Sequence, residues 1–494
     1  MTEASNLILF MADNHNRDYV GCYGHPVVQT PTIDRIAASG VRFANAYAAS
    51  AVCCPARAAI ATGRYPHQTG YWDNSLVYDG RIPSWHRRLR EQGHTVTSVG
   101  KLHYLEDGPD YGFTESVIPM HIVESRGALF GLLRATREGE RSRPSPRLQY
   151  SRTGIGDDSD YVVYDRDITE KAIAWLKDHA KPSGKPWVLF VSYAAPHPPF
   201  VVPQRLMDLY PPERMKLPPQ FSAADQPHHP AEDHIRRLHE FEGLASEDFV
   251  RRTVAGYCAL ITHMDEQIGK VMQVAEELDL LASTRVIYTS DHGEAAGHHG
   301  LFAKSIVHEH SIGIPFVMMG QGIPEGRTVG QIATHVDLFP TIAETVGAAL
   351  TEEDGDLTGV SLWPAIGGAE TDRIGFSEYH GHGSKSGMYA LRRGRYKLLY
   401  FVAMPSLLFD LEADPGETTD LMATDEGCRI AADLEAELRQ ILDPEAVDAR
   451  AKRDQRAQIE RMGGIEACLG AGNYLNNPVP GKEPELFGFG EQAN

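Results

Sequence analysis

The sequence predicts an α/β protein in which a large, mostly parallel sheet carries helices on both faces. Apolar runs of strand length alternate with helical patterns over most of the chain. With 494 residues, the chain also exceeds the roughly 250–300 residues at which a single core stops growing. From about residue 375 the alternation gives way to short strand patterns and a charged helix. We therefore expect a first domain over residues 1–375 and a small α+β domain over residues 376–494.

The alternation can be followed element by element. Strands are predicted at Asn6–Ala12, Thr95–Val99, Trp187–Tyr193 and Arg285–Ser290, and helices at Thr32–Ala38, Trp85–Gln92 and Asp165–Asp178. Toward the C-terminus, strands are predicted at Met388–Arg392, Tyr396–Phe401 and Leu407–Asp410, and a helix at Arg429–Leu442. In a sheet of this kind, ligands bind beyond the carboxyl ends of the strands.

Three segments do not fit the alternation. Residues 137–160 are rich in Arg, Ser, Pro and Gly, and residues 196–234 are rich in Pro and His. We expect both to be long loops beside the mouth of the site, where they would select the substrate. The tail Asn476–Asn494 contains Pro and Gly throughout, so we expect it to be irregular and to pack on a neighbouring subunit of a homo-oligomer.

Charge and cysteine content limit the partners. Forty-seven basic and 67 acidic residues give a net charge of −20, which disfavours nucleic acid or a sulfated polysaccharide. No apolar run approaches the ~20 residues of a membrane span, and we recognise no export signal at the N-terminus. The six cysteines are too sparse for a disulfide framework and match no zinc spacing. We expect a cytoplasmic protein that binds a small substrate in a locally positive pocket.

Polar side chains follow four of the predicted strands. They are Asp13 and Asn14, Lys101 and His103, His197, and Asp291 and His292. Since the carboxyl ends of parallel strands share one edge of the sheet, these side chains should converge. Two carboxylates and an amide suit a hard cation such as calcium or magnesium better than zinc.

The most informative segment is Cys53-Cys54-Pro55-Ala56-Arg57, followed four residues later by Thr62-Gly63-Arg64. A proline near the start of an Ala-rich stretch that ends at Gly63 predicts a short helix. Cys53 would lie just ahead of the positive end of this helix, where an anion is stabilised. From composition alone, a purely structural buried cysteine pair is the more common explanation.

This segment resembles the signature of the sulfatase family, an alkaline-phosphatase-like three-layer sandwich. In that signature a cysteine, any residue, proline, a small residue and arginine precede Thr-Gly-Arg or Thr-Gly-Lys. A maturation enzyme oxidises the first cysteine to formylglycine (3-oxoalanine). Only Cys53 has proline two places on and arginine four places on, so it would be the nucleophile, although Ala56 replaces the commoner serine. One hydroxyl of the hydrated aldehyde would attack sulfur, and deprotonation of the other would expel sulfate.

The resemblance also implies roles for the strand-end residues. Asp13, Asn14, Asp291 and His292, with the modified Cys53, would bind one divalent ion. Calcium is the ion we expect, with magnesium or manganese as alternatives. Arg57 would hold the hydrated nucleophile. Lys101, His103, His197 and Lys304 would neutralise the sulfate, and either histidine could protonate the leaving alcohol.

The resemblance spans residues 6 to about 422, with two departures. Asn14 stands where the family usually has Asp or Gln, and Gly313 stands where many members have arginine. The stretch Ser290–Glu294 and its continuation to Lys304 looks like the second long signature of the family. Leu408–Leu411 and Asp414–Glu417 resemble its small C-terminal domain.

Other reactions stay open. Phosphonate monoesterases and phosphodiesterases of the same superfamily resemble this chain around Cys53 and Asn74, whose amide could bind a nonbridging oxygen. The Lys101–His103 pair favours sulfate, with choline sulfatases or arylsulfatases as models. Choline would need an aromatic cage, for which Tyr71, Trp72 and Tyr104 are candidates. An alternative of another class is a metal-binding pseudoenzyme with an unconverted Cys53. A reaction through a serine or threonine nucleophile, as in alkaline phosphatases, is disfavoured because position 53 is a cysteine.

Overall fold

The computed structural model describes residues 3–487, apart from residues 126, 135, 138–144, 157–158, 180–183 and 245. Part of the predicted 137–160 loop and the end of the predicted tail, residues 488–494, lie outside the described residues. Among the helices that the structure describes, none combines the length and the apolar character needed to cross a bilayer.

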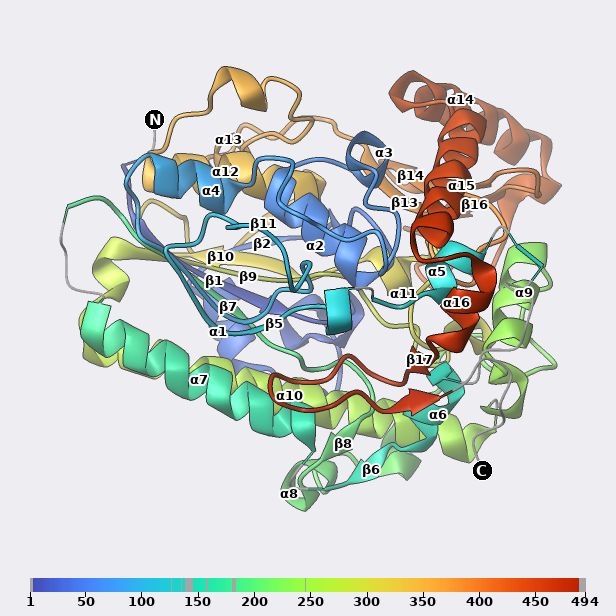
Figure 1. The fold of residues 1–494 in the computed structure, drawn as a ribbon, viewed down its shortest axis with the longest axis horizontal. Coiled ribbons are helices and arrows are strands. Elements are labelled where there is room, and N and C mark those ends of the chain that lie inside the picture. Colours follow the sequence, from blue (N-terminus) through green and yellow to red (C-terminus); the bar gives the residue numbers. More distant parts are fainter. Residues whose placement is uncertain are drawn as a thin grey trace.

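The core is an eight-stranded sheet (Figure 1). Its order is β11 (Arg327–Val329), β2 (Gly40–Phe43), β10 (Phe316–Met319), β9 (Thr284–Ser290), β1 (Asn6–Ala12), β7 (Val188–Ser192), β4 (Val96–Lys101) and β5 (Glu115–Met120). Strand β10 runs antiparallel to both neighbours, and the other pairs are parallel. This confirms the predicted mixed, mostly parallel sheet.

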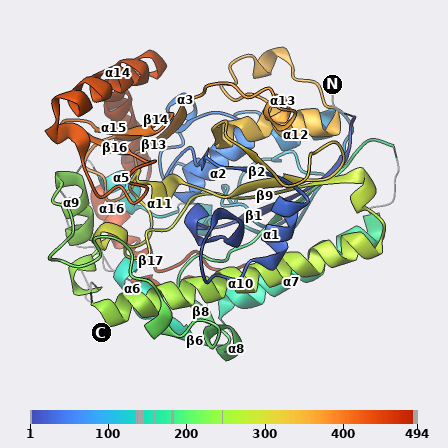
Figure 2. The same ribbon diagram turned by 180° about the vertical axis from the view of Figure 1, so that it is seen from behind.

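Helices cover both faces of this sheet (Figures 1 and 2). On one face lie α2 (Cys53–Thr62), α4 (Trp85–Glu91) and α12 (Leu338–Val346), and on the other lie α1 (Pro31–Ala38), α7 (Asp160–His179) and α10 (Glu247–Glu277). Strand β1 shows why two cores form. Its Leu7, Leu9 and Met11 pack in the core on the face covered by α2, and its Ile8 and Phe10 pack in the core on the face covered by α10. Because successive side chains of a strand point to opposite faces, the result is the predicted three-layer sandwich.

The C-terminal part builds a smaller α+β unit. An antiparallel sheet joins β13 (Gly375–Tyr379), β14 (Met388–Arg393), β15 (Tyr396–Phe401) and β16 (Leu407–Asp410). The helices α14 (Asp425–Ile441), α15 (Pro444–Arg461) and α16 (Ile465–Gly470) follow. The short strands β17 (Asn473–Tyr474) and β18 (Leu486–Phe487) then pair with each other. The small antiparallel C-terminal domain is confirmed.

The two predicted loops are partly helical, which corrects the sequence-based expectation. The first contains α6 (Ser145–Ser151) and β6 (Gly154–Ile155); the second contains β8 (Val201–Val202), α8 (Gln204–Met207) and the start of α9 (Pro230–Leu238). Besides short 3-10 helices, the remaining short elements are β3 (Ala46–Tyr47), β12 (Ala333–Thr334), α3 (Pro66–Thr69), α5 (Phe130–Leu133), α11 (Glu309–Ile312) and α13 (Trp363–Ile366). Single-turn helices of this size carry too little periodicity to be read from sequence.

Candidate active site

Cys53 occupies the first position of α2, whose residues are all buried. The Ala-rich sequence favours the helix. Gly63 ends it in the left-handed conformation, with a φ of 66° that glycine adopts at little cost. The first-turn N–H groups and the positive end of the helix dipole therefore lie at Cys53, as predicted. One of these groups is already used, because the N–H of Cys54 donates to Asn74 Oδ1 at 3.1 Å.

Asp13 and Asp291 lie side by side because β1 and β9 are neighbours in the sheet. One oxygen of each binds Arg57, whose Nη2 donates to Asp13 Oδ2 at 3.0 Å and whose Nε donates to Asp291 Oδ2 at 2.8 Å. All three side chains are at most 1% exposed, so these charge-assisted bonds are strong. Asp13 Oδ1 is instead 3.8 Å from Cys53 Sγ. Arg57 thus turns the second oxygen of Asp13 toward the nucleophile.

With Cys53 unmodified, Arg57 binds other groups, and its predicted contact with the hydrated nucleophile stays a prediction. Its Nη1 donates to the Lys101 carbonyl at 2.8 Å and to Ser192 Oγ at 3.1 Å, and it does not line the cavity at Cys53. The two carboxylates attract the guanidinium more strongly than a neutral side chain at position 53 does. Arg57 orients the site through its acids.

Four donor groups converge in a way that fits a metal ion. Ligand atoms of Asp13, Cys53, Asp291 and His292 all lie within 4.8 Å of one another. His292 Nδ1 donates to the Gly293 carbonyl at 3.0 Å, which leaves Nε2 with its lone pair, 3.0 Å from Cys53 Sγ. Two carboxylates favour a hard divalent ion, and the imidazole widens the choice toward transition metals.

Asn14 lies beside this donor set with its polar atoms engaged. Its amide oxygen accepts a hydrogen bond from Lys304 Nζ at 3.0 Å, and its backbone N–H donates to Asp291 Oδ1, also at 3.0 Å. Its φ of 75° is left-handed, and so is the φ of 56° at His103. Such conformations cost about 1–3 kcal/mol each and gather at functional sites.

The positive side of the site is built from buried lysines and histidines. Lys101 is fully buried, and its Nζ lies 2.8 Å from Asp13 Oδ2. Burial alone would raise the pKa of Asp13, but the surrounding cations, led by Lys101, outweigh it and hold that pKa well below its usual range. Burial, followed by the charge of Asp13, raises the pKa of the Cys53 thiol to about 12. An unmodified Cys53 is therefore a neutral thiol and a poor nucleophile.

The two candidate acids differ in their partners. His197 Nδ1 donates to the Pro198 carbonyl at 2.7 Å, so its Nε2 is the nitrogen left for a ligand. Both ring nitrogens of His103 are buried without a hydrogen-bond partner. Burial lowers the pKa of both histidines well below the usual value, assisted by Lys304 at His197 and by Lys101 at His103. An anion bound between the histidines and the lysines would offset the repulsion between their positive charges and so raise the pKa of both histidines.

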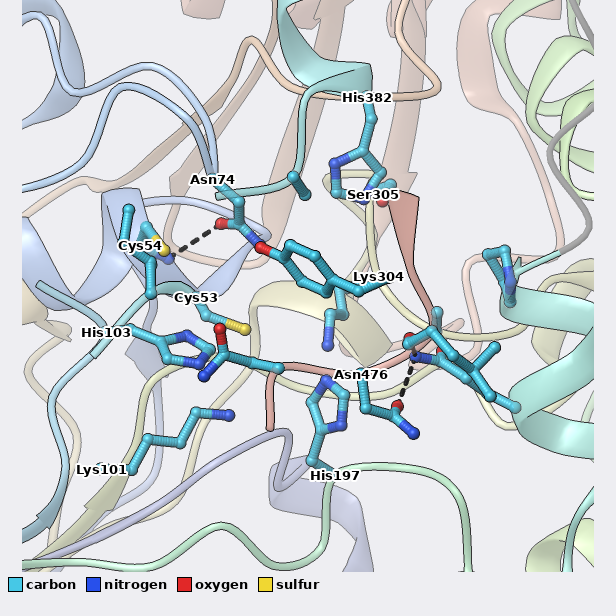
Figure 3. A pocket seen from close by; sticks show the side chains of 18 of the residues that line it. Cys53, Cys54, Asn74, Lys101, His103, His197, Lys304, Ser305, His382 and Asn476 are labelled. Atoms are coloured by element: carbon cyan, nitrogen blue, oxygen red, sulfur yellow. Dashed lines mark hydrogen bonds between the residues drawn. The ribbon is translucent and has the colours of Figure 1, made fainter. Parts of the chain in front are cut away.

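A cavity of about 90 Å³ opens in front of Cys53. Figure 3 shows the sulfur of Cys53 facing it, with Lys101, His103, His197 and Lys304 arranged around the same space. Cys54 and the predicted Asn74 also line it. The structure thus brings together the predicted strand-end groups at one edge of the sheet.

The rim contains residues that the sequence did not single out individually, although Gln149 lies in the segment 137–160 that was expected beside the mouth of the site. They are Gln149 on α6, Tyr161 on α7, His239 after α9, His382 after β13, and Tyr474 to Asn477. The start of the tail therefore borders the pocket of its own chain, and packing of the tail on a neighbouring subunit stays a prediction. Asn477 Oδ1 accepts from the Val123 N–H at 3.0 Å, and Tyr161 Oη donates to the Asn477 carbonyl at 2.9 Å. Nothing in the sequence of an irregular tail indicates such long-range contacts.

The predicted aromatic cage is not formed. Trp72 is fully buried and donates from Nε1 to Asp454 on α15 at 2.8 Å, and it does not line the cavity. Tyr71 and Tyr104 pack around Tyr78 in the core. The low-polarity ring surfaces are more stable in these cores than at the pocket. The substrate contact expected of Trp72 is therefore wrong.

The comparisons with known proteins agree with this geometry. The family model described as Sulfatase matches residues 5–348, which is more than half of the chain. The chain belongs to the sulfatase family. A second model, described as the C-terminal part of N-sulphoglucosamine sulphohydrolase, matches residues 297–443 of this sulfatase.

Curated relatives match this sulfatase over nearly its full length. A choline-sulfatase of Rhizobium meliloti is 29% identical over 475 residues, covering 92% of this chain and 90% of the relative. Arylsulfatase K of Rattus norvegicus is 29% identical over 486 residues, covering 93% of this chain and 82% of the relative.

Solved structures share the fold. A phosphonate monoester hydrolase of Agrobacterium radiobacter superposes with a TM-score of 0.71 at 23% identity, covering 90% of this chain and 96% of the other. A structure described as a complex with its substrate D-glucosamine-2-N,6-O-disulfate also gives 0.71, at 22% identity, and covers 92% and 99%. The sandwich with its C-terminal domain is thus the alkaline-phosphatase-like fold that the sequence predicts.

The structure also accounts for Gly313, where many sulfatases have arginine. The guanidinium carbon of Arg17 lies 3.5 Å from the place that a Cβ at position 313 would take. Arg17 Nη2 donates to Glu309 at 2.8 Å, and its N–H donates to the Gly313 carbonyl at 3.1 Å. A side chain at position 313 would therefore meet the Glu309 carbonyl and the Arg17 guanidinium, which occupies the adjacent space.

Proposed function

We propose that this sulfatase hydrolyses the sulfate ester of a small alcohol or phenol, with formylglycine made from Cys53 as its nucleophile. One observation supports this more than any other. Cys53 stands at the start of α2 between a metal-type donor set and four cationic or imidazole side chains. A negatively charged ester that must be attacked by a hydroxyl needs both surroundings.

The modified residue supplies a hydrated aldehyde, and a divalent ion held by Asp13, Asp291 and His292 would make that hydroxyl more acidic. Asn14 would complete the shell if its oxygen turned from Lys304. Calcium is the ion we favour on the two carboxylates, with magnesium or manganese as alternatives. Conversion of Cys53 requires a formylglycine-generating maturation enzyme as partner.

The other residues bind and orient the ester. Lys101 and Lys304 place positive charge on two sides of the cavity, where they would balance the sulfate oxygens. His103 has two nitrogens without partners, so it is available as a donor to the same oxygens. The Pro198 carbonyl fixes the proton on His197 Nδ1, so Nε2 can donate to the leaving oxygen when the ring is an imidazolium, a form that the bound anionic ester would stabilise. We therefore assign His197 as the acid.

The lining favours an uncharged, hydroxyl-bearing alcohol. Among the described residues that line the cavity there is no carboxylate, and amides come from Asn74, Gln149, Asn476 and Asn477. Amides bind hydroxyl groups, whereas a quaternary ammonium such as choline needs an aromatic cage, and the described lining offers the rings of Tyr161 and Tyr474 without a carboxylate beside them. The small volume of the cavity excludes a large leaving group from full burial.

A phosphonate monoester or phosphodiester is the second candidate. The amide of Asn74 lines the cavity beside Cys53, where it could bind a nonbridging oxygen, and two of the similar structures are phosphonate monoester hydrolases. A metal-binding pseudoenzyme with an unconverted Cys53 is the candidate of another class.

Peptide mass spectrometry across Cys53, on protein produced with the maturation enzyme, tests the proposal. We expect the mass of formylglycine, and faster turnover of p-nitrophenyl sulfate than of p-nitrophenyl phenylphosphonate. The reverse preference would support the second candidate. An unmodified, inactive protein would support the pseudoenzyme. A cytoplasmic location and a homo-oligomeric state are further proposals, to be tested by cell fractionation and sedimentation.

A further inference from the structure

A second group of metal-type side chains lies outside the cavity at Cys53. It consists of Glu232 on α9, His299, and His308 just before α11, and we call it the Glu232 cluster. None of the three is more than 1% exposed, and none lines the cavity at Cys53. The three side chains of the Glu232 cluster have no part in the proposed sulfatase reaction.

The donor atoms of the cluster converge. One ligand atom from each side chain lies within 4.8 Å of the other two. His308 Nε2 is 2.9 Å from Glu232 Oε1, and the rings of His299 and His308 are 4.6 Å apart at an angle of 75°. Three segments distant in sequence thus meet at one point.

The second polar atom of each side chain is held by another group. Glu417 Oε2 lies 3.0 Å from His308 Nδ1, Arg236 donates to Glu232 Oε2 at 2.7 Å, and the Gly416 carbonyl lies 3.0 Å from His299 Nε2. This is the outer shell that metal-binding histidines and carboxylates have, since it fixes the tautomer and aims the free atom. The free atom of His299 is Nδ1, which is buried and has no hydrogen-bond partner.

From this arrangement we infer that Glu232, His299 and His308 form a second metal site, which takes zinc. Two imidazole nitrogens and one carboxylate oxygen are ligands that zinc prefers, and a water molecule can complete its tetrahedral shell. With two imidazoles and one carboxylate, the Glu232 cluster offers fewer oxygen ligands to calcium or magnesium than the catalytic donor set does.

The metal would take the place of the direct contact between His308 and Glu232. The His308 ring lies between two carboxylates, with Nε2 2.9 Å from Glu232 Oε1 and Nδ1 3.0 Å from Glu417 Oε2. A divalent ion between His308 Nε2 and Glu232 would satisfy the same carboxylates with more charge. It would also tie α9 to the segment that carries Lys304 and, through Glu417, to the C-terminal domain.

Zinc binding by full-length protein tests the site, in a background where Asp13→Ala and His292→Ala weaken the catalytic donor set. After equilibration with zinc and removal of free ion, elemental analysis should find one zinc per chain, and zinc should raise the melting temperature. Adding His299→Ala should abolish both effects, while adding His228→Ala, a histidine that is 81% exposed, should change neither.

Cobalt provides a second measurement. It should give the visible absorption of a tetrahedral site in the same background, and Glu232→Gln, which keeps the shape of the side chain, should remove that spectrum. Absence of bound zinc in the background, or equal zinc with and without His299→Ala, would overturn the inference. Since the background does not turn over substrate, neither result depends on the proposed sulfatase reaction.

Discussion

Arg57 is the residue on which the acidic half of the site depends. It is fully buried and pairs with both Asp13 and Asp291. Removing it leaves two buried carboxylates without their main partner, a change that costs about 3–5 kcal/mol in comparable buried pairs. We expect Arg57→Ala to lower the free energy of unfolding by about that amount in the presence of a chelator, as measured by urea denaturation.

The matched control for Arg57 is Arg87→Ala. Its partner is Glu91, and both side chains are nearly half exposed, so the loss should stay within about 1 kcal/mol. Equal effects for the two variants would show that the Arg57 pairs contribute no special stability.

Cys53 and Cys54 offer a matched pair for the nucleophile. Both are buried and line the cavity, but only the Sγ of Cys53 approaches the metal-type donors. We expect Cys53→Ala to reduce kcat by at least about 10³-fold with an unchanged circular dichroism spectrum, and Cys54→Ala to retain kcat within about tenfold. Activity in Cys53→Ala comparable to the parent protein would rule out the proposed nucleophile.

At the residue scale, prediction from sequence succeeded where a motif met a strand end. Asp13, His197 and Asp291 follow strands of one sheet and Lys101 ends another, so strand order alone brings them together. The prediction failed for Trp72, because an aromatic side chain near the nucleophile helix can be buried either at the pocket or in the protein core. Its hydrogen bond to Asp454 spans 382 residues, and no local pattern encodes such a contact.

At the scale of elements, α7 holds the loop that carries His197. Asp165 on α7 is fully buried, and its two oxygens accept the N–H groups of Ala194 at 2.7 Å and Ala195 at 3.0 Å. These N–H groups lie beyond the end of β7 and have no carbonyl of a neighbouring strand to bind, so the Asp165 carboxylate accepts their hydrogen bonds instead. Asp165 is therefore a positioning residue.

Asp165 should also make stability depend on pH. Burial outweighs the two backbone donors and raises its pKa to about 7. The folded state thus binds this proton more tightly than the unfolded state, where the pKa is about 3.9. The stability supplied by the protonated form is complete below about pH 4 and is lost as pH rises to about 7, on the order of 4 kcal/mol in all.

The variant Asp165→Asn removes this titration. The stability advantage of the parent over the variant should be larger at about pH 5 than at about pH 8, measured by urea denaturation. Asp167→Asn, on the exposed side of the same helix, is the control and should leave the pH profile unchanged. An advantage that does not vary with pH would contradict the role given to Asp165.

Helices and strands could be predicted from sequence where the pattern of apolar residues is unambiguous. The continuous apolar run of β1 was placed at its true bounds, Asn6–Ala12. The 31-residue α10 was not predicted, although Ser246 caps it, because its buried residues nearly encircle the helix in places and blur the period of 3.6. The antiparallel β10 was not predicted either, since strand direction is decided by the connections and not by composition.

At the scale of the whole molecule, metal binding should couple activity to stability. In the metal-free state Asp13 and Asp291 face each other, with Arg57 and Lys101 as their directly paired counter-charges. A chelator should abolish turnover and lower the melting temperature, since an ion at about 100 times its Kd adds roughly 2.7 kcal/mol. Calcium, magnesium or manganese should restore both, and the ion effective at the lowest concentration is the one the site prefers. Full activity after exhaustive chelation would exclude a metal-assisted reaction.

The tail links the C-terminal domain to the pocket, and its removal tests how the molecule closes its site. Asn477 binds Val123 through its side chain and Tyr161 through its carbonyl, and both Asn477 and Tyr161 line the cavity. Deleting residues 476–494 should raise KM about tenfold, the equivalent of one lost contact of about 1.4 kcal/mol, and change kcat little. Asn477→Ala should show part of the same effect with the chain intact. If the tail serves only its own subunit, the sedimentation coefficient should be consistent with an unchanged number of subunits. A loss of subunits together with the rise in KM would mean that the same segment also holds a neighbour, as the irregular tail first suggested.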